Sequence, residues 1–176
     1  ASALSHPNLI RVENFGVTPE GRTFIIMDFV QGVSLADVIA KEGKIDPVRA
    51  VFIFVQAANA LQHAHERNVI HRDLKPSNIL FDHYGDAFLA DFGIARLTSA
   101  SSQLTASGSL VGTPTYMSPE QVYGNKELDG RSDIYSLACV VFEALAGVPP
   151  FNGPVESLLN QHLSVTPRPV SDIRLG

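Results

Sequence analysis

The residues best suited to chemistry lie in the run IHRDLKPSNIL, at positions 70–80. Within six positions this run holds an acid, a lysine and an amide, which are Asp73, Lys75 and Asn78. A second acid, Asp91, follows thirteen residues after the amide, in the tripeptide DFG. Phosphoryl transfer depends on positioning and charge neutralisation rather than on covalent work. The run therefore holds the groups needed to handle a phosphoryl group and its metal.

Each of the four polar residues suits a separate task. Asp73 can accept a hydrogen bond from an attacking hydroxyl and take its proton, and Lys75 can contact the transferred phosphate as a compact positive charge. Asn78 and Asp91 offer two oxygen ligands of the kind that Mg²⁺ shares with phosphate and water. Each residue alone is weak evidence, because an acid in a turn commonly forms the turn and a lone lysine is commonly solvated.

Two short apolar strands are expected to bring these groups together. Residues 79–81 leave the polar turn, and residues 87–90 return after the loop DHYGD. The returning strand delivers Asp91 at its end. The pair Asp73 and Asn78 should therefore meet Asp91 at the same edge.

The first part of the chain predicts a hairpin and a short helix. Residues 9–12 and 23–30 are extended runs that should pair antiparallel, because the second is rich in β-branched and aromatic residues. Ser34 with Asp37 fits a helix N-cap with an acid at the third helical position, and Gly43 fits a helix stop.

Two longer helices follow. Asp46 and Pro47 open a helix to about residue 66, and His63 and His65 on it lie two apart, which favours surface or helix-end roles over metal binding. Residues 131–146 are apolar on most faces and predict a helix at the centre of the core. The apolar face predicted for the first of these helices comprises Val51, Phe54, Val55, Ala58, Leu61 and either Ala64 or His65.

The bulk composition describes an ordinary globular domain. The 176 residues are 45% hydrophobic with a net charge of −5, so a general affinity for nucleic acid is not expected. The single cysteine, Cys139, excludes an intramolecular disulfide, and its apolar neighbours predict a buried thiol. The longest apolar run, residues 137–142, is far shorter than the roughly 20 residues that span a bilayer, so this segment should make no membrane contact.

A serine- and threonine-rich stretch without charge occupies residues 97–111. It fits either a solvated linker or a regulatory loop that accepts phosphate. The following run GTPTYMSPE, residues 112–120, is turn-rich but more apolar, and should be docked against the core.

Order and spacing together carry a far more specific signal than any single residue. The runs HRDLKPSN (71–78), DFG (91–93) and SPE (118–120) resemble the catalytic loop, the magnesium-binding motif and the end of the activation segment of eukaryotic-type Ser/Thr protein kinases. The resemblance covers essentially the whole chain and is greatest to bacterial receptor-type kinases. It implies an α+β fold: residues 1–30 would be a remnant of the N-terminal lobe (the end of its helix, two strands and the start of the hinge), and residues 31–176 the mostly helical C-terminal lobe, truncated before its final helices.

The resemblance also implies a function. It is ATP-dependent phosphorylation of Ser/Thr hydroxyls on protein substrates, with Mg²⁺, or Mn²⁺ in its place. Asp73 would be the catalytic base, Lys75 the phosphate contact, and Asn78 and Asp91 the metal ligands. The other implied residues are Met27 as gatekeeper; Asp28, Phe29 and Val30 as the hinge that binds adenine; Leu80 beneath the adenine ring; Arg72, Thr113, Glu120 and Asp133 as structural residues; and Thr105 and Ser107 as phosphate acceptors.

Three of these residues carry further expectations. Asp133 would brace the catalytic loop from the central helix, the alternative being an exposed acid favoured by the helix dipole. Arg72 beside the catalytic acid implies activation by loop phosphorylation, and Lys75 together with the GTP run (112–114) favours Ser/Thr over Tyr substrates. A kinase dimer for trans-autophosphorylation is a further expected partner. The expected location is cytoplasmic, with the parent protein anchored through a segment outside this chain.

The chain also departs from the family pattern. The glycine-rich phosphate-covering loop, the strand lysine and its helix glutamate are absent, while residues 4–10 resemble the end of that helix. The arginine that pairs with Glu120 in the family would lie beyond Gly176. We therefore expect an internal piece of a kinase domain that is poorly stable and inactive by itself.

Two other interpretations compete with a protein kinase. Small-molecule phosphotransferases of the aminoglycoside type also use an Asp…Asn pair and a downstream acid, but they lack the platform of residues 112–120. A pseudokinase that serves as a binding or scaffold module is the second. The intact catalytic residues argue against it, whereas the missing lysine and glutamate leave it open.

Overall fold

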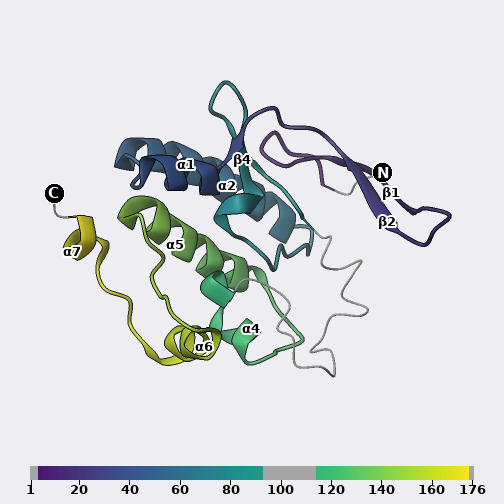
Figure 1. Cartoon of the computed structure of the whole chain (residues 1–176). Helices are drawn as coiled ribbons and strands as arrows, with labels where there is room; N and C mark the ends of the chain where they lie inside the picture. The colour runs from purple at the N-terminus through teal and green to yellow at the C-terminus, as the bar shows by residue number, and fades with distance from the viewer. Residues whose placement is uncertain (1–3, 93–113, 175–176) are drawn as a thin grey trace.

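The computed structural model describes residues 4–92 and 114–174. Within them, a mostly helical body carries two small sheets, and one of these is a hairpin that projects away from the helices (Figure 1). The α+β class predicted from the sequence is confirmed.

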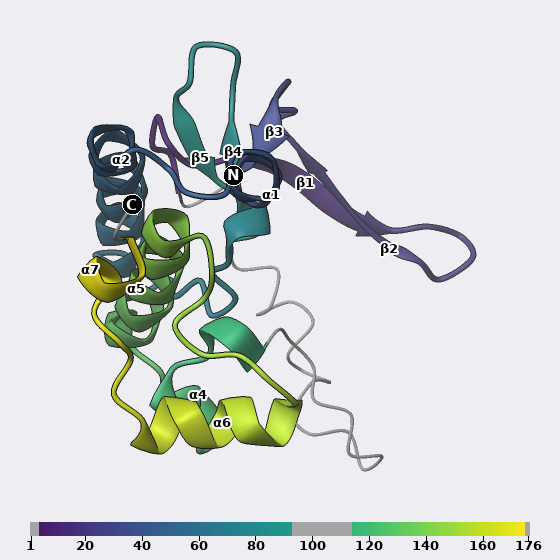
Figure 2. The same ribbon diagram turned by 60° about the vertical axis from the view of Figure 1, so that its left-hand side comes forward.

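The projecting hairpin consists of β1 (Val12–Val17) and β2 (Thr23–Met27), which pair antiparallel from Val17↔Thr23 to Val12↔Met27. The predicted hairpin is confirmed, but its first strand begins at Val12, the last residue of the predicted run 9–12. Leu9 forms a parallel bridge with Leu89 instead, and the Ile10 N–H donates to the Leu89 carbonyl over 3.0 Å. Residues 9 and 10 are therefore held by the second sheet, and the hairpin starts beyond them (Figure 2).

The second sheet has the order β3 (Val33–Ser34), β4 (Ile79–Phe81), β5 (Ala87–Leu89), all antiparallel. The predicted return of the chain after the DHYGD loop is confirmed by the pair Ile79↔Leu89. Gly32 lies so close to β4 that a Cβ there would be 1.7 Å from the Phe81 carbonyl oxygen. Only glycine fits at that position, immediately before β3.

The helix ends follow the predicted capping chemistry. Ser34 and Asp37 form a reciprocal capping box at the start of α1 (Leu35–Glu42), and Gly43 ends that helix at φ 76°. The Asp46 carboxylate accepts from two backbone N–H groups at the start of α2 (Pro47–His65). These local signals set where both helices begin, and Gly43 sets where α1 ends.

The buried face of α2 differs from the prediction. Val51 and Val55, predicted to be in the core, are 62% and 53% exposed. The buried positions are mostly alanines, and α2 packs against α5 (Gly130–Ala146) through this face. The small alanine side chains allow α2 to pack closely against α5. The hydrophobic pattern of the sequence instead favoured the bulkier valines for the buried face. The buried residues are Ala50, Ile53, Ala57, Ala60, Leu61 and Ala64.

The α5 helix lies at the centre of the body, as predicted, and ends at Gly147 with φ 78°. Its residues Leu137, Val140 and Ala144 belong to the main core together with β4 and β5. Cys139 is buried and free, and burial raises the pKa of its thiol to about 12. The remaining elements are the short 3-10 helices η1 (Pro76–Asn78) and η2 (Pro114–Tyr116), and the helices α4 (Pro119–Val122), α6 (Val155–Ser164) and α7 (Val170–Arg174). None of the helices formed by the described residues has the length and apolar character needed to cross a bilayer.

The corrected face of α2 predicts a contrast between two neighbouring apolar residues. Ile53→Ala should lower the free energy of unfolding by about 2–5 kcal/mol, because Ile53 is 3% exposed and its removal leaves a cavity. Val55→Ala should change it by less than about 0.5 kcal/mol. Urea unfolding of the two variants measures both values, and a larger loss for Val55→Ala would contradict this packing.

Candidate active site

The polar turn between α2 and β4 places the predicted catalytic residues on one short loop. The Lys75 ammonium lies 2.6 Å from a carboxylate oxygen of Asp73, and both side chains are partly exposed. Asn78 is buried and donates its amide N–H to the Asp73 carbonyl over 2.8 Å. This bond uses the nitrogen of the Asn78 amide and leaves its oxygen for another partner.

The second acid lies beside this loop, as the sequence predicted. The Ala90 N–H donates to the Asn78 carbonyl over 2.9 Å, so the end of β5 is joined to η1 immediately before Asp91. Asp91 is exposed and has φ 62°, a left-handed conformation that non-glycine residues rarely adopt. The structure thus brings Asn78 and Asp91 to one edge.

The oxygen donors at this edge fit a magnesium ion that shares its ligands. Asn78 and Asp91 supply one amide and one carboxylate group, and the described residues contain no cluster of three or more His, Cys, Asp or Glu that could hold a metal. Mg²⁺ keeps several waters and is commonly bound by one or two protein groups plus phosphate. The oxygen atoms of Asn78 and Asp91 fit this way of binding Mg²⁺, and not a site in which the protein supplies all of the ligands.

Asp133 holds the loop from the first turn of α5. It is 1% exposed, and its carboxylate accepts from the backbone N–H groups of His71 and Arg72, both over 2.8 Å. A third contact comes from His65 Nε2 at 2.7 Å. The alternative of an exposed helix-start acid is therefore wrong, because the side chain is buried under the loop.

His65 is a contact that the sequence did not reveal. It ends α2, as a helix-end role predicts, but its ring contacts Asp133 instead of solvent. The ring also packs on Gly130, where an added Cβ would lie 2.5 Å from His65 Nδ1. The residues involved are more than sixty positions apart, so no local spacing signals the contact.

His71 ties the loop to β5 and to the DFG tripeptide. It is fully buried; Nε2 lies 2.8 Å from the Ala90 carbonyl, and Nδ1 accepts from the Asp73 N–H over 3.3 Å. These partners require a neutral imidazole with its proton on Nε2. Burial lowers the pKa of His71 even though the nearby carboxylates act to raise it. The ring also meets Phe92 edge-on, with centroids 4.6 Å apart.

The predicted hinge follows β2. The Asp28 N–H donates to the Arg11 carbonyl over 2.9 Å, and its carboxylate lies 3.4 Å from the Arg11 guanidinium. The Phe29 side chain is 88% exposed, and among the described residues the backbone of Phe29 and Val30 makes no hydrogen bond. Met27 is 38% exposed, and Leu80 pairs with Ser34 just beyond the hinge. These positions leave the hinge backbone available to a ligand.

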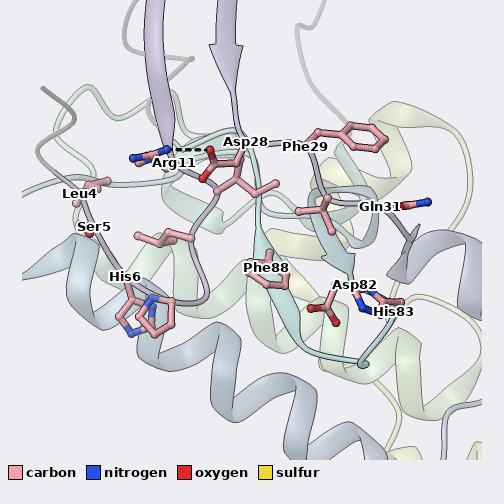
Figure 3. Close-up of a pocket in the computed structure, with 14 residues that line it drawn as sticks. Leu4, Ser5, His6, Arg11, Asp28, Phe29, Gln31, Asp82, His83 and Phe88 are labelled. Carbon is pink, nitrogen blue, oxygen red and sulfur yellow. Dashed lines mark hydrogen bonds and ion pairs between the residues drawn. The ribbon is translucent and has the colours of Figure 1, made fainter.

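A cavity of about 510 Å³ lies behind this hinge (Figure 3). It is lined by residues 4–11 without Asn8, by residues 28–31, and by Asp82, His83 and Phe88. Asp73, Asn78 and Asp91 are not part of its lining. The catalytic loop and this cavity are therefore separate features.

The segment after the undescribed stretch is anchored on α5. Ser118 caps α4, and Ser132 Oγ donates to the Glu120 carboxylate over 2.5 Å. Burial acts to raise the pKa of Glu120, but the hydrogen bonds from Ser132 and its neighbours lower it overall. Glu120 was expected to need an arginine outside the chain; here Ser132 is a partner. Arg174 donates instead to the carbonyls of Ile45 and Leu145.

Three predicted residues lie outside the described part of the chain. They are Thr105, Ser107 and Thr113.

Comparison with known proteins identifies the family. The family model named protein kinase domain matches residues 1–168 of this chain. The chain belongs to the protein kinase domain family. It is 41% identical over 177 residues to serine/threonine-protein kinase PknB of Mycobacterium tuberculosis, with 97% of this chain and 28% of that protein covered. It is 42% identical over 177 residues to PknB of Mycolicibacterium smegmatis, with the same coverage, and 39% over 181 residues to PknB of Mycobacterium leprae, with 100% of this chain and 29% of that protein covered.

This kinase-family chain thus spans less than a third of the length of the curated relatives it matches. The match confirms the protein-kinase-like fold predicted from the HRDLKPSN, DFG and SPE runs. Similarity to a bacterial Ser/Thr kinase is confirmed as well.

The buried state of His71 predicts a pH dependence of stability. Its folded pKa is lowered, so the neutral ring stabilises the fold at pH values above the unfolded pKa of about 6.5, and this contribution is lost as the pH falls. His71→Phe keeps the ring but cannot titrate. Between pH 6.5 and 5 its unfolding free energy should fall less steeply than that of the wild type, by up to about 1.4 kcal/mol per pH unit. Urea unfolding across this range tests the difference, and identical slopes would contradict a neutral buried His71.

Proposed function

We propose that this chain is the catalytic part of a protein Ser/Thr kinase that transfers the γ-phosphoryl group of ATP to hydroxyls on protein substrates. The observation that carries the proposal is the assembly of Asp73, Lys75 and Asn78 on one loop beside Asp91. Membership of the protein kinase domain family and similarity to the Ser/Thr kinases named above support the same conclusion.

The proposed step assigns one role to each of these residues. The substrate hydroxyl donates to the Asp73 carboxylate, which takes its proton as the oxygen attacks the γ-phosphorus and ADP leaves. Lys75 is paired with Asp73 in this structure, and it would exchange that carboxylate for the transferred phosphate. Mg²⁺, or Mn²⁺ in its place, would be held by Asn78 and Asp91 and would neutralise the phosphate charge when bound.

The hinge would bind the adenine. Among the described residues the backbone of Phe29 and Val30 makes no hydrogen bond, so it could bond a planar base. Met27 and Leu80 would contact the ring from either side of the hinge. Asp133 would keep its structural role of holding the loop while the nucleotide enters and leaves.

Regulation and specificity complete the proposal. Thr105 and Ser107 would accept phosphate within the serine-rich stretch, and Arg72 would pair with that phosphate. Lys75 and Thr113 would favour Ser/Thr substrates. Dimerisation would allow one copy to phosphorylate another. Both competing classes, a scaffold pseudokinase and a small-molecule phosphotransferase, predict no transfer to protein hydroxyls.

The assignment of the base predicts a large loss of activity. In a longer protein that includes this chain, Asp73→Asn should reduce transfer of radiolabelled phosphate from ATP to a protein substrate by about 10²–10⁴-fold, the usual contribution of a positioned general base. His63→Ala, at a half-buried position near the end of α2 whose ring lies against His6, should retain activity. Activity of Asp73→Asn within a few-fold of wild type would contradict the role of Asp73.

The chain by itself is expected to be inactive. We propose that residues outside it supply the contacts to the α- and β-phosphates, because the glycine-rich loop and the strand lysine of the family are not among its residues. The 176-residue polypeptide should therefore show little phosphorylation with Mg-ATP, while the longer protein is active. Robust magnesium-dependent kinase activity from the 176 residues would contradict this expectation.

A further inference from the structure

One side chain that the proposed function does not use joins the catalytic loop to α4. The Gln121 amide oxygen accepts from the Ser118 N–H over 2.9 Å, which completes the capping box of α4. Its amide nitrogen donates to the Arg72 carbonyl over 2.6 Å. Gln121 therefore bonds two segments that lie more than forty residues apart in the sequence.

The Arg72 carbonyl belongs to the peptide group that leads into the catalytic base. The N–H of the same peptide group, that of Asp73, donates to His71 Nδ1 over 3.3 Å. Gln121 thus holds the oxygen of this peptide plane and His71 holds its nitrogen. With both atoms fixed, the plane cannot rotate, and the direction in which the Asp73 side chain leaves the backbone is set.

This plane is under strain, so it needs restraint. Arg72 has φ 70°, a left-handed conformation that is unfavourable for a side chain with a Cβ. Its N–H is bonded to Asp133 over 2.8 Å, and its carbonyl is bonded to Gln121. A strained residue persists only where its surroundings determine its conformation, and here one hydrogen bond on each side does so.

The other end of the Gln121 link is the segment that precedes α4. The Tyr116 hydroxyl donates to Glu143 over 2.6 Å, and Ser136 Oγ donates to the Tyr116 carbonyl over 2.7 Å, so η2 is anchored on α5. Ser118 lies two residues after Tyr116 and is fully buried. A displacement of residues 114–118 would therefore move Gln121 and release the Arg72 carbonyl.

From this geometry we propose that Gln121 is a positioning residue for the phosphoryl-transfer step. It would orient Asp73 through the Arg72 carbonyl, and it would make the orientation of the base depend on docking of residues 114–118. The inference rests on the proposed kinase function and deepens it. The capping box alone could be completed by either glutamine or glutamate at position 121. The hydrogen bond to the Arg72 carbonyl needs an N–H donor, which only glutamine has.

Gln121→Glu separates these two roles. A glutamate oxygen can still accept from the Ser118 N–H, so the capping box is kept, but an ionised carboxylate cannot donate to the Arg72 carbonyl. Gln161→Glu is the matched control. The Gln161 amide also donates to a backbone carbonyl, that of Asn152 over 2.9 Å, on α6 away from the catalytic loop.

The experiment measures kcat, the KM for ATP and the melting temperature of these variants in the longer kinase. Gln121→Glu should lower kcat by about 10–100-fold, the scale of a small misplacement of a catalytic group, with KM for ATP within about twofold. Its melting temperature should match that of Gln161→Glu. Gln121→Met, which loses both bonds, should lower kcat at least as much. A kcat of Gln121→Glu within twofold of the control would overturn the proposal.

Amide hydrogen exchange provides a readout that does not depend on activity. Exchange of residues 70–74 should be faster in Gln121→Glu than in the wild type and in Gln161→Glu, because the Arg72 turn loses one restraint. If neither the wild type nor Asp73→Asn phosphorylates a protein substrate, the proposed function fails. The exchange rates of residues 70–74 still decide whether Gln121 restrains the catalytic loop. Unchanged exchange at residues 70–74 would overturn it.

Discussion

The candidate active site depends on one buried charge, the Asp133 carboxylate. An ionised group at 1% exposure is costly unless hydrogen bonds replace its hydration, and here the replacements are two backbone N–H groups and His65 Nε2. Leaving such a group without one of its hydrogen bonds costs about 1–3 kcal/mol or more. Because its partners belong to the end of α2 and to the catalytic loop, the carboxylate joins both to α5. The loop has this shape because the charge requires donors in these places.

The other restraints of the loop follow from that bond. Once the N–H groups of His71 and Arg72 are aimed at α5, Arg72 is forced to φ 70°, and the next peptide plane must be held separately. His71 does so while also binding the Ala90 carbonyl, so one imidazole contacts both the peptide group before Asp73 and the segment between β5 and Asp91. The chemistry at Asp73 is thus set by groups that never touch a substrate.

Local signals in the sequence predicted much of the fold. Capping by Ser34 and Asp46, the strand pair around the DHYGD loop and the central helix depend on neighbours in sequence, and all were found. Asp73, Lys75 and Asn78 were predicted to lie together because their spacing lies within one motif. The buried face of α2 was predicted only in part. Leu61 and Ala64 are buried, but Val51 and Val55 are exposed, since hydrophobic periodicity favours large side chains where close packing needed alanine. The contacts of His65 and Gln121 were missed because their partners are distant in the chain and no local pattern marks them.

The two sides of the site differ in how they are held. The catalytic loop is fixed by bonds to α4, to α5 and to Ala90, which follows β5, and these bonds are partly or fully buried. The hinge and the hairpin before it are packed far less tightly. Phe15, Val17 and Phe24 on the hairpin are 41–65% exposed, and Phe29 in the hinge is 88% exposed. Exposed aromatic and β-branched residues on a two-stranded hairpin supply little stability by themselves. Among the described residues, the catalytic loop is therefore held by more buried hydrogen bonds than the hinge and the hairpin are.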